Sequence, residues 1–414
     1  MKTLCKAAIL ISSLGVISTG HALDVNILNE SESFSRISVD SLGRPYVAGK
    51  STGTISRVAV AAATASGVLR WSRVIDTDPA GVADPLLSRV IGNTLTVGWR
   101  GNFGLPSTTG QYGCLRLATA TGSTTSSDTQ PVSGYLQLEG ATLASNGTYY
   151  CVGNSTPDLS NVPYAGAIYS YASPAPGLVS TIPGVGSQHI YFRDVIAMPN
   201  GLVVCGYILD AGYSTGFIAK YDRATNAQLW FTTIPGVETF PTKLGIDAAG
   251  NFFASGEQLN ALDTDTFFAK VSPNGTLLAQ TSVFMPGTNE YVTDMCIVGG
   301  STPAICGASG TNSDYYVATA TADLAMTQAV TDPGFSAALA IAQDGTNFYA
   351  SSSTGRTTKF NAVGQTFWTR DHAGIGIIYD LVCSGTSLYA AGKNGGFTDG
   401  QISKLNTANG DLVW

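Results

Sequence analysis

One short pattern recurs eight times along nearly the whole chain, and it restricts the fold more than any other feature of the sequence. Each copy has an apolar run, a turn with glycine, and a second apolar run that ends in a small residue and a marker position. The marker holds Gly49, Gly98, Gly153, Gly206, Gly256, Gly307, Ser352 and Gly392. Successive markers are 40 to 55 residues apart. A period of this length indicates a repeat architecture.

Each copy contains four short alternating runs; in the first copy these are residues 36–39, 46–48, 55–60 and 68–74. Several copies turn on Asn-Gly or Asp-Gly, which suit tight hairpins: Asn146-Gly147, Asn200-Gly201, Asn274-Gly275 and Asp344-Gly345. A four-stranded unit leaves both of its faces exposed, so several units must stack around an axis. The sequence therefore predicts an all-β fold, a single β-propeller of about eight four-stranded blades over residues 23–414. Seven blades are the alternative, if one degenerate copy does not form. We expect Asp24–Leu28 to supply the closing strand.

Tryptophan supports the same interpretation independently. Trp71, Trp230, Trp368 and Trp414 each lie in or next to a predicted fourth strand, and the residues four positions earlier are Gly67, Asn226, Gly364 and Gly410. Glycine and asparagine adopt a left-handed turn at little cost. We expect each tryptophan to pack between blades; the alternative is a stacking platform for a sugar or a quinone ring.

Two segments carry a family resemblance: Ala219-Lys-Tyr-Asp222-Arg-Ala-Thr225-Asn226-Ala-Gln-Leu-Trp230 and Lys404-Leu-Asn406-Thr-Ala-Asn409-Gly410-Asp-Leu-Val-Trp414. They resemble the tryptophan-docking repeat of quinoprotein-like (PQQ-like) propellers, and the strand pair before them resembles the secreted bacterial β-propeller repeat family. The resemblance implies the propeller fold strongly and the chemistry weakly. A quinone-dependent dehydrogenase would carry a vicinal cysteine pair and a calcium cluster, and the sequence shows neither. No cofactor and no metal are therefore expected.

The first 22 residues have the features of a secretory signal peptide. Lys2 and Lys6 stand in the first residues, an apolar run of about a dozen residues follows over 7–18, and Gly20-His21-Ala22 offers small residues before a cleavage site. An uncleaved anchor would need about 20 apolar residues to cross a bilayer. The sequence predicts a secreted or periplasmic monomer without membrane insertion. The net charge of −7 and the lack of basic runs argue against a nucleic-acid partner.

Motifs typical of catalysis have structural explanations. Gly49-Lys50-Ser51-Thr52-Gly53 matches the nucleophile motif of serine hydrolases and comes near a phosphate-binding loop, but both need a strand that feeds a helix. No helix is expected there. Beyond the signal peptide only His189 and His372 remain, and we place both in linkers. We therefore assign no catalytic residue.

Six cysteines remain in the mature chain. Cys205 and Cys306 occupy the small-residue slot before the marker, which indicates buried apolar side chains. Cys296 and Cys306 flank a Gly-Gly-Ser turn on neighbouring strands, so they are the one pair that we expect to be able to form a disulfide.

The carboxylates fall into three groups. Asp40, Asp247 and Asp344 lie in hairpin turns, where aspartate bonds backbone amides. Asp263, Asp265, Asp314 and Asp399 precede third strands; they are interpreted as solvated loop residues, with a calcium site as the alternative. Asp194, Asp294 and Asp380 recur 12 or 13 residues before their markers, and Arg36 and Lys243 take the same position in two other copies. We place these five at the start of the innermost strands, at the mouth of the channel.

These five charges allow two interpretations. A mixed ring of acids and bases could orient a polar ligand in a partly desolvated cleft. Alternatively the charges solvate strand ends and pair with one another. The function expected from the whole sequence is a secreted, non-catalytic binding or scaffold module for an extracellular glycan, protein or surface polymer. The alternative is an enzyme that works at the channel mouth, of the quinoprotein-like or the carboxylate-based lyase or hydrolase type.

Overall fold

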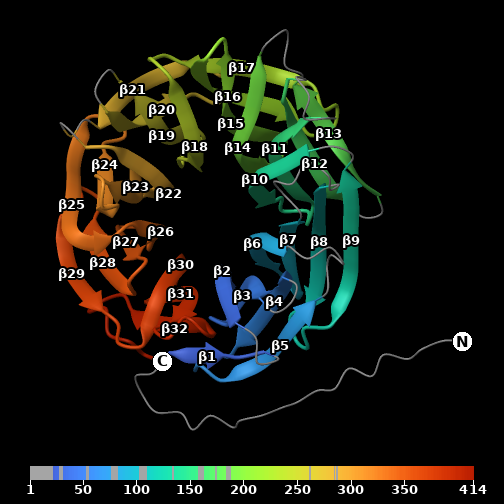
Figure 1. Ribbon diagram of the computed structural model, residues 1–414, viewed down its shortest axis with the longest axis vertical. Helices are drawn as coiled ribbons and strands as arrows, with labels where there is room; N and C mark the ends of the chain where they lie inside the picture. The colour runs from blue at the N-terminus through green and yellow to red at the C-terminus, as the bar shows by residue number, and fades with distance from the viewer. Residues whose placement is uncertain are drawn as a thin grey trace, which may run out of the picture.

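The computed structural model describes residues 22–27, 31–52, 56–75, 83–101, 110–132, 135–156, 163–172, 175–182, 188–260, 263–283, 285 and 288–414. The predicted signal peptide lies outside these residues apart from Ala22. The described chain forms 32 strands and contains no helix. The strands form eight four-stranded antiparallel sheets arranged in a ring around a central axis (Figure 1). The prediction of an eight-bladed β-propeller is confirmed.

The first four blades run from the innermost to the outermost strand in chain order. Blade 1 is β2 (Ser31–Val39), β3 (Pro45–Thr52), β4 (Ser56–Ala63) and β5 (Leu69–Ile75). Blade 2 is β6 (Ala83–Ile91), β7 (Thr94–Gly101), β8 (Gly110–Ala118) and β9 (Thr124–Val132). Blade 3 is β10 (Tyr135–Leu143), β11 (Tyr149–Thr156), β12 (Ala165–Ala172) and β13 (Ala175–Ile182). Blade 4 is β14 (His189–Met198), β15 (Gly201–Asp210), β16 (Tyr213–Asp222) and β17 (Gln228–Ile234).

The next three blades follow the same order. Blade 5 is β18 (Thr239–Ile246), β19 (Phe252–Leu259), β20 (Thr264–Val271) and β21 (Leu277–Val283). Blade 6 is β22 (Glu290–Val298), β23 (Thr302–Ser309), β24 (Asp314–Ala320) and β25 (Met326–Ser336). Blade 7 is β26 (Ala338–Gln343), β27 (Asn347–Ser352), β28 (Arg356–Asn361) and β29 (Thr366–Asp371).

Blade 8 joins the two ends of the chain. It takes β30 (Ile375–Ser384), β31 (Ser387–Asn394) and β32 (Gly400–Asn406) from the C-terminal end, and its outermost strand is β1 (Leu23–Val25) (Figure 1). Leu23 pairs with Ile402, and Val25 pairs with Gly400. The expected closing strand is therefore present, and it covers an edge of β32 that would otherwise be unpaired.

Each innermost strand contains a β-bulge at the same place. The extra residues are Ser35, Leu86, Glu139, Arg193, Thr242, Thr293, Leu339 and Tyr379. The bulged strand approaches the second strand so closely that a Cβ atom at six of the markers would lie 1.7–2.0 Å from a carbonyl oxygen of the innermost strand. This approach explains the marker glycine. Blade 2 differs from the predicted pattern because Trp99, not Gly98, pairs with the residue before the bulge.

Four tryptophans each pack on the next blade. A Cβ atom added to the turn glycine of that blade would lie 2.5–2.7 Å from the indole ring; the pairs are Trp71 with Gly122, Trp230 with Gly275, Trp368 with Gly410 and Trp414 with Gly67. All four glycines have positive φ. The expected packing between blades is confirmed. Blades 2, 3, 5 and 6 lack a tryptophan in the fourth strand; the turn residues after blades 3 and 5 are Asn226 and Leu324, whereas Gly364 follows blade 6 and faces Gln328.

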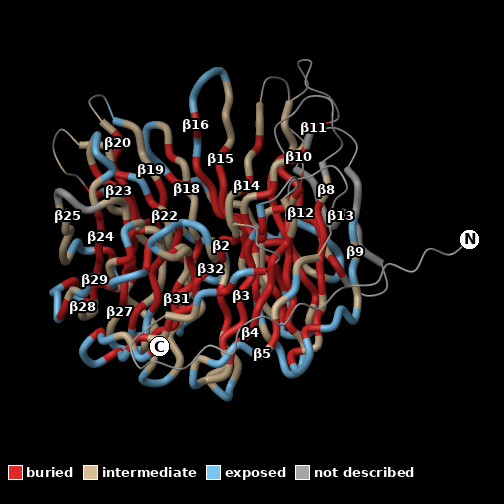
Figure 2. The backbone as a smooth tube through the Cα atoms, turned by 60° about the horizontal axis from the view of Figure 1, so that its bottom comes forward, coloured by how far each residue is buried: buried red, intermediate tan, exposed pale blue. Residues whose placement is uncertain are grey.

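The core lies between the blades, as the buried segments inside the ring show (Figure 2). Alternate residues of one strand face opposite neighbours, so Val204 packs with blade 3 whereas Val203 and Cys205 pack with blade 5. Lys50 and Ser51 lie within β3, and the next element is a strand, so the structural explanation of the Gly49–Gly53 motif holds.

We predict that Gly122→Ala lowers the free energy of unfolding by about 2–4 kcal/mol, because the methyl group meets Trp71 at a residue whose φ is positive. Gly92→Ala is the matched control, since Gly92 also has positive φ but its Cβ would meet no atom within 4 Å. The free energy of unfolding of the Gly92→Ala control should fall by about 1 kcal/mol. Urea unfolding of both variants measures the difference, and equal losses would show that the tryptophan contact does not constrain the turn.

Candidate functional site

The five predicted charges occupy one position of the repeat, the residue that follows the bulge. The full set around the channel is Arg36, Leu87, Gly140, Asp194, Lys243, Asp294, Ala340 and Asp380. Asp194 is the sixth of ten residues in β14, so the charges lie midway along the innermost strands and not at their starts. The predicted placement was wrong because polar residues, such as Ser31 and Ser33, extend the strands beyond their apolar runs.

The three aspartates connect neighbouring blades. Asp194 accepts the backbone N–H of Val195 with Oδ1 at 2.8 Å and the N–H of Leu244, in the next blade, with Oδ2 at 2.9 Å. The same bonds join Asp294 to Met295 and Ile341, and Asp380 to Leu381 and Ile37. Innermost strands are edge strands, whose N–H groups need acceptors. These carboxylates supply acceptors at three of the blade junctions.

The two bases belong to the same level of the channel. Arg36 donates from Nε to the carbonyl oxygen of Leu86 in the next blade at 2.8 Å. Burial raises the pKa of Asp380 to about 6, although Arg36 acts in the opposite direction. Burial likewise raises the pKa of Asp194, and Lys243 opposes that shift. The structure thus brings the five predicted residues together as one interacting set.

A second set of charges, which the sequence analysis missed, occupies blades 2 to 4. Arg193 and Glu139 are bulge residues, and Arg193 Nη1 lies 3.1 Å from Glu139 Oε1. Arg100 also pairs with Glu139 and links it to a fourth charge: its Nη1 lies 3.7 Å from Glu139 Oε2, and its Nη2 lies 3.3 Å from Asp84 Oδ2. All four side chains are partly buried. We call this set the charge chain.

Aromatic rings lie beside the charge chain, at the end of the ring where innermost strands begin. Tyr191 stacks on Tyr207 with centroids 4.7 Å apart, and Tyr207 meets Phe240 of blade 5 edge-on at 5.0 Å. The ring centroid of Tyr164, in blade 3, lies 5.6 Å from that of Tyr191 and 5.3 Å from that of His189, both in blade 4. These five rings form the aromatic row. Its members come from three blades, so no single copy of the repeat reveals it.

Direct contacts join the aromatic row to the charge chain. Arg193 donates from Nη2 to the Tyr207 hydroxyl at 3.2 Å, and its guanidinium carbon lies 5.4 Å from the ring centroid of Tyr207. Burial raises the pKa of Glu257, whereas its bond from the N–H of Val292 and the cations of Arg193 and Lys243 act against that shift. Aromatic faces and charged hydrogen-bonding groups thus gather at one end of the channel.

The two histidines serve as local structural residues. His189 is the first residue of β14, not part of a linker as predicted, and its Nδ1 accepts the N–H of Tyr164 at 3.2 Å. His372 lies in a loop and is buried, which lowers its pKa to about 4. The turn prediction for Asp40 is confirmed, since its Oδ1 accepts the N–H groups of Leu42 and Arg44.

The six described cysteines are free thiols. Cys296 pairs with Ala304 and Cys306 pairs with Asp294, so the two sulfur-bearing residues are diagonal neighbours and not direct partners. The predicted disulfide is therefore absent from the structure. Burial raises the pKa of both thiols, which disfavours the reactive thiolate. Among the described residues, no group of three or more His, Cys, Asp and Glu side chains is arranged to hold a metal ion.

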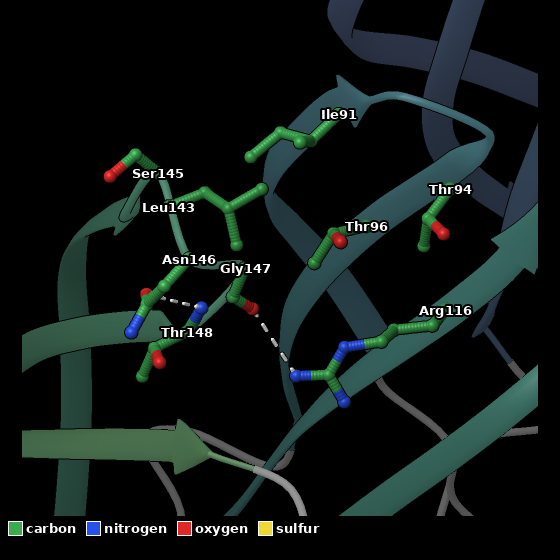
Figure 3. A pocket seen from close by; sticks show the side chains of 9 residues that line it. All are labelled: Ile91, Thr94, Thr96, Arg116, Leu143, Ser145, Asn146, Gly147 and Thr148. Carbon is green, nitrogen blue, oxygen red and sulfur yellow. Dashed lines mark hydrogen bonds between the residues drawn. The ribbon is translucent and has the colours of Figure 1, made fainter.

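A cavity of about 540 Å³ lies between blades 2 and 3 at the opposite end of the ring, next to the hairpin turns at Gly92 and Gly147 (Figure 3). Arg116 lines it, but its guanidinium already donates to the carbonyl oxygens of Gly147 and Tyr171 and pairs with Asp128 at 3.6 Å. The other lining side chains are small, neutral or apolar. The aromatic row and the charge chain are therefore the stronger candidate.

Comparisons with known proteins support the fold. No family model and no curated protein matches the chain. Among solved structures the chain is similar to the computationally designed Ika8 protein, with a TM-score of 0.56 and 11% identity over 92% of this chain and 99% of that chain. This likeness concerns the propeller fold alone. No described helix is long and apolar enough to cross a membrane.

We predict that Asp380→Asn lowers the free energy of unfolding at pH 5 by about 1–3 kcal/mol, because the asparagine amide turns a donor NH₂ group toward one of the two backbone N–H groups, whereas each carboxyl oxygen, ionised or protonated, keeps a lone pair for its donor. The pKa of Asp380 is raised in the folded protein, so the native state binds its proton more tightly than the unfolded chain does. The stability of the wild type relative to Asp380→Asn should therefore fall as the pH rises from about 4 to about 6.

Asp323→Asn provides the control, since Asp323 is exposed on a loop of blade 6 and should change stability by less than about 0.5 kcal/mol. Urea unfolding between pH 4 and pH 8 measures both variants. A variant Asp380→Asn as stable as wild type throughout would show that the carboxylate does not hold the blades together.

Proposed function

We propose that this protein is a secreted, non-catalytic binding propeller, and that its ligand is a glycan bound at the end of the channel that carries the aromatic row. The observation that carries the proposal is the meeting of stacked rings and paired charges from blades 2 to 5 at that end. Export rests on the signal-peptide pattern of residues 1–22.

The aromatic row suits sugar rings. Sugars have apolar C–H faces that pack on aromatic side chains, while their hydroxyl groups need hydrogen-bond partners. Tyr164, Tyr191 and Phe240 are partly exposed, whereas Tyr207 is 9% exposed and supports the other rings from below. The rings follow one another across three blades at centroid spacings of 4.7–5.6 Å, with the buried ring of Tyr207 between those of Tyr191 and Phe240.

The charges beside the row suit sugar hydroxyl groups. Glu139 and Arg193 are held by ion pairs, and Glu257 is held by the N–H of Val292 at 2.9 Å. Side chains fixed in this way lose little conformational entropy when a ligand binds. Carboxylate and guanidinium groups pair with neighbouring hydroxyls, and such polar groups give specificity in a largely apolar site.

The alternative is an enzyme that uses acids of the channel, of the quinoprotein-like or the carboxylate-based type. A carboxylate that acts as general acid or nucleophile must reach the substrate. Asp194, Asp294 and Asp380 each already accept two backbone N–H bonds. This arrangement supports binding over catalysis.

The test is a glycan array followed by calorimetry on the best ligand. Tyr191→Ala should weaken binding at least about tenfold, because the ring is at the centre of the row. Tyr213→Ala is the matched control: Tyr213 is 69% exposed at the hairpin of blade 4 and belongs to neither set. The Tyr213→Ala variant should bind the glycan with the same affinity as the wild type.

Two results would contradict the proposal. Equal affinity of Tyr191→Ala and Tyr213→Ala would place the ligand elsewhere. Shortened glycan products, released by the wild type and not by a variant with Glu139→Gln, would show an enzyme.

A further inference from the structure

Two buried carboxylates lie at the junction of blades 5 and 6, where Glu257 of blade 5 accepts the N–H of Val292 in blade 6. Glu290 is the first residue of β22 and is fully buried, and Asp265 in β20 is 6% exposed. Both belong to the same end of the ring as the aromatic row, since Thr266, next to Asp265, pairs with Glu257. The interpretation of Asp265 as a solvated loop residue is wrong, because β20 begins before it, at Thr264, and its side chain is buried.

Within the part of the chain that the structure describes, only one oxygen of Glu290 accepts hydrogen bonds. Oε1 accepts a bond from Ser309 Oγ at 3.2 Å and another from the hydroxyl of Thr288. Oε2 is inaccessible to solvent and has no hydrogen-bond partner among the described residues. Leaving a charged oxygen buried without a partner is costly, so such an atom calls for an explanation.

Asp265 likewise has one oxygen that accepts a hydrogen bond and one that is buried without a partner among the described residues. Its Oδ2 accepts a bond from Asn260 Nδ2 at 2.8 Å, whereas Oδ1 is buried without a partner among the described residues. Neither carboxylate takes part in an ion pair found in the described part of the chain. Two negative groups thus share a junction to which none of these ion pairs brings a cation.

The electrostatics agree with the geometry. Burial raises the pKa of Glu290 to about 7, and Asp265 and Asp263 repel its charge further. Hydroxyl oxygens are also present, since Thr266 Oγ1 and the Tyr316 hydroxyl lie 2.7 Å apart and both acids perturb the pKa of Tyr316. The junction therefore combines two carboxylates with neutral oxygen atoms.

We propose that a divalent cation of the Ca²⁺ type binds between blades 5 and 6, with Glu290 Oε2 and Asp265 Oδ1 as its charged ligands. The ion neutralises the two carboxylates and satisfies their unpartnered oxygens. Ca²⁺ takes six to eight oxygen ligands and accepts irregular geometry, so hydroxyl groups and water complete the shell. Two carboxylates are few for this ion, which places the affinity near the weak range of extracellular modules, about 10⁻⁴–10⁻³ M.

Blade 1 offers a matched position. Glu32 is also fully buried, and its Oε1 accepts a bond from Ser51 at 3.3 Å, as Glu290 does from Ser309. The surroundings of Glu32 differ from those of Glu290. The carboxylate of Asp399, in blade 8, accepts hydrogen bonds from the side-chain amides of Asn26 and Asn394. The ammonium group of Lys393 lies near the residue before Glu32, with Nζ 3.5 Å from Oγ of Ser31. The cation is assigned to the junction of blades 5 and 6 alone.

The experiment measures thermal unfolding of the full chain at pH 8, first in EDTA and then with about 10 mM CaCl₂, roughly ten times the weakest expected Kd. The melting temperature of the wild type should rise by about 2 °C or more with calcium. Glu290→Gln should remove this rise, and Glu32→Gln should keep it. In EDTA, Glu290→Gln should melt at or above the wild-type temperature because an uncompensated buried charge is gone.

Terbium luminescence gives a second measurement, since Tyr316 can transfer excitation energy to a Tb³⁺ ion at this junction. Calcium should displace the signal from the wild type, and Asp265→Asn should lack it; this variant also carries the test if Glu290→Gln does not fold. Three results would overturn the proposal. The wild type could show no response to calcium, Glu290→Gln and Asp265→Asn could retain the response, or Glu32→Gln could lose it as well.

Discussion

Each innermost strand has a bulge that gives it at least one residue more than the strand beside it, and this bulge determines much of the structure around it. The bulge brings the innermost strand against the second strand, which only a glycine accommodates at six of the eight markers. It also sets two residues side by side in each innermost strand, the extra residue and the one that resumes the pairing. The first of the two, such as Glu139 and Arg193, joins the charge chain, and the second, such as Asp194, joins the blades. A feature of backbone geometry therefore sets both the repeat and the chemistry of the channel.

Two kinds of charge serve different purposes around the channel. The aspartates at the blade junctions accept backbone N–H groups that the sheet leaves unpaired, and they stand in blades 4, 6 and 8. The charge chain runs through blades 2 to 4 and contacts the aromatic row through Arg193 and Tyr207. At the junction of blades 4 and 5, Asp194 and Trp230 both fix the two blades relative to each other, which holds the ring of Tyr207 against that of Phe240.

The sequence predicted the fold well because glycine, tryptophan and turn residues repeat with local causes. A marker glycine or an Asn-Gly turn is required by backbone geometry within one blade, so each copy carries its own evidence. The candidate site has no such signature. Tyr164, Tyr191 and Phe240 come from three consecutive copies, and they form one row with Tyr207 only because neighbouring blades pack together. The placement of Asp194 and Asp380 at strand starts was wrong because the innermost strands extend beyond their apolar runs. The orphaned oxygens of Glu290 and Asp265 depend on distances that no sequence pattern encodes.

The central claim is that carboxylates on one blade hold the innermost strand of the next, and amide hydrogen exchange measured by NMR tests it most directly. The amides of Leu244, Ile341 and Ile37 donate to Asp194, Asp294 and Asp380. They should exchange as slowly as the paired amides of the same strands, and Asp194→Asn should release Leu244 while leaving Ile341 protected. Exchange of these three amides in the wild type at the rate of exposed loops would contradict the account.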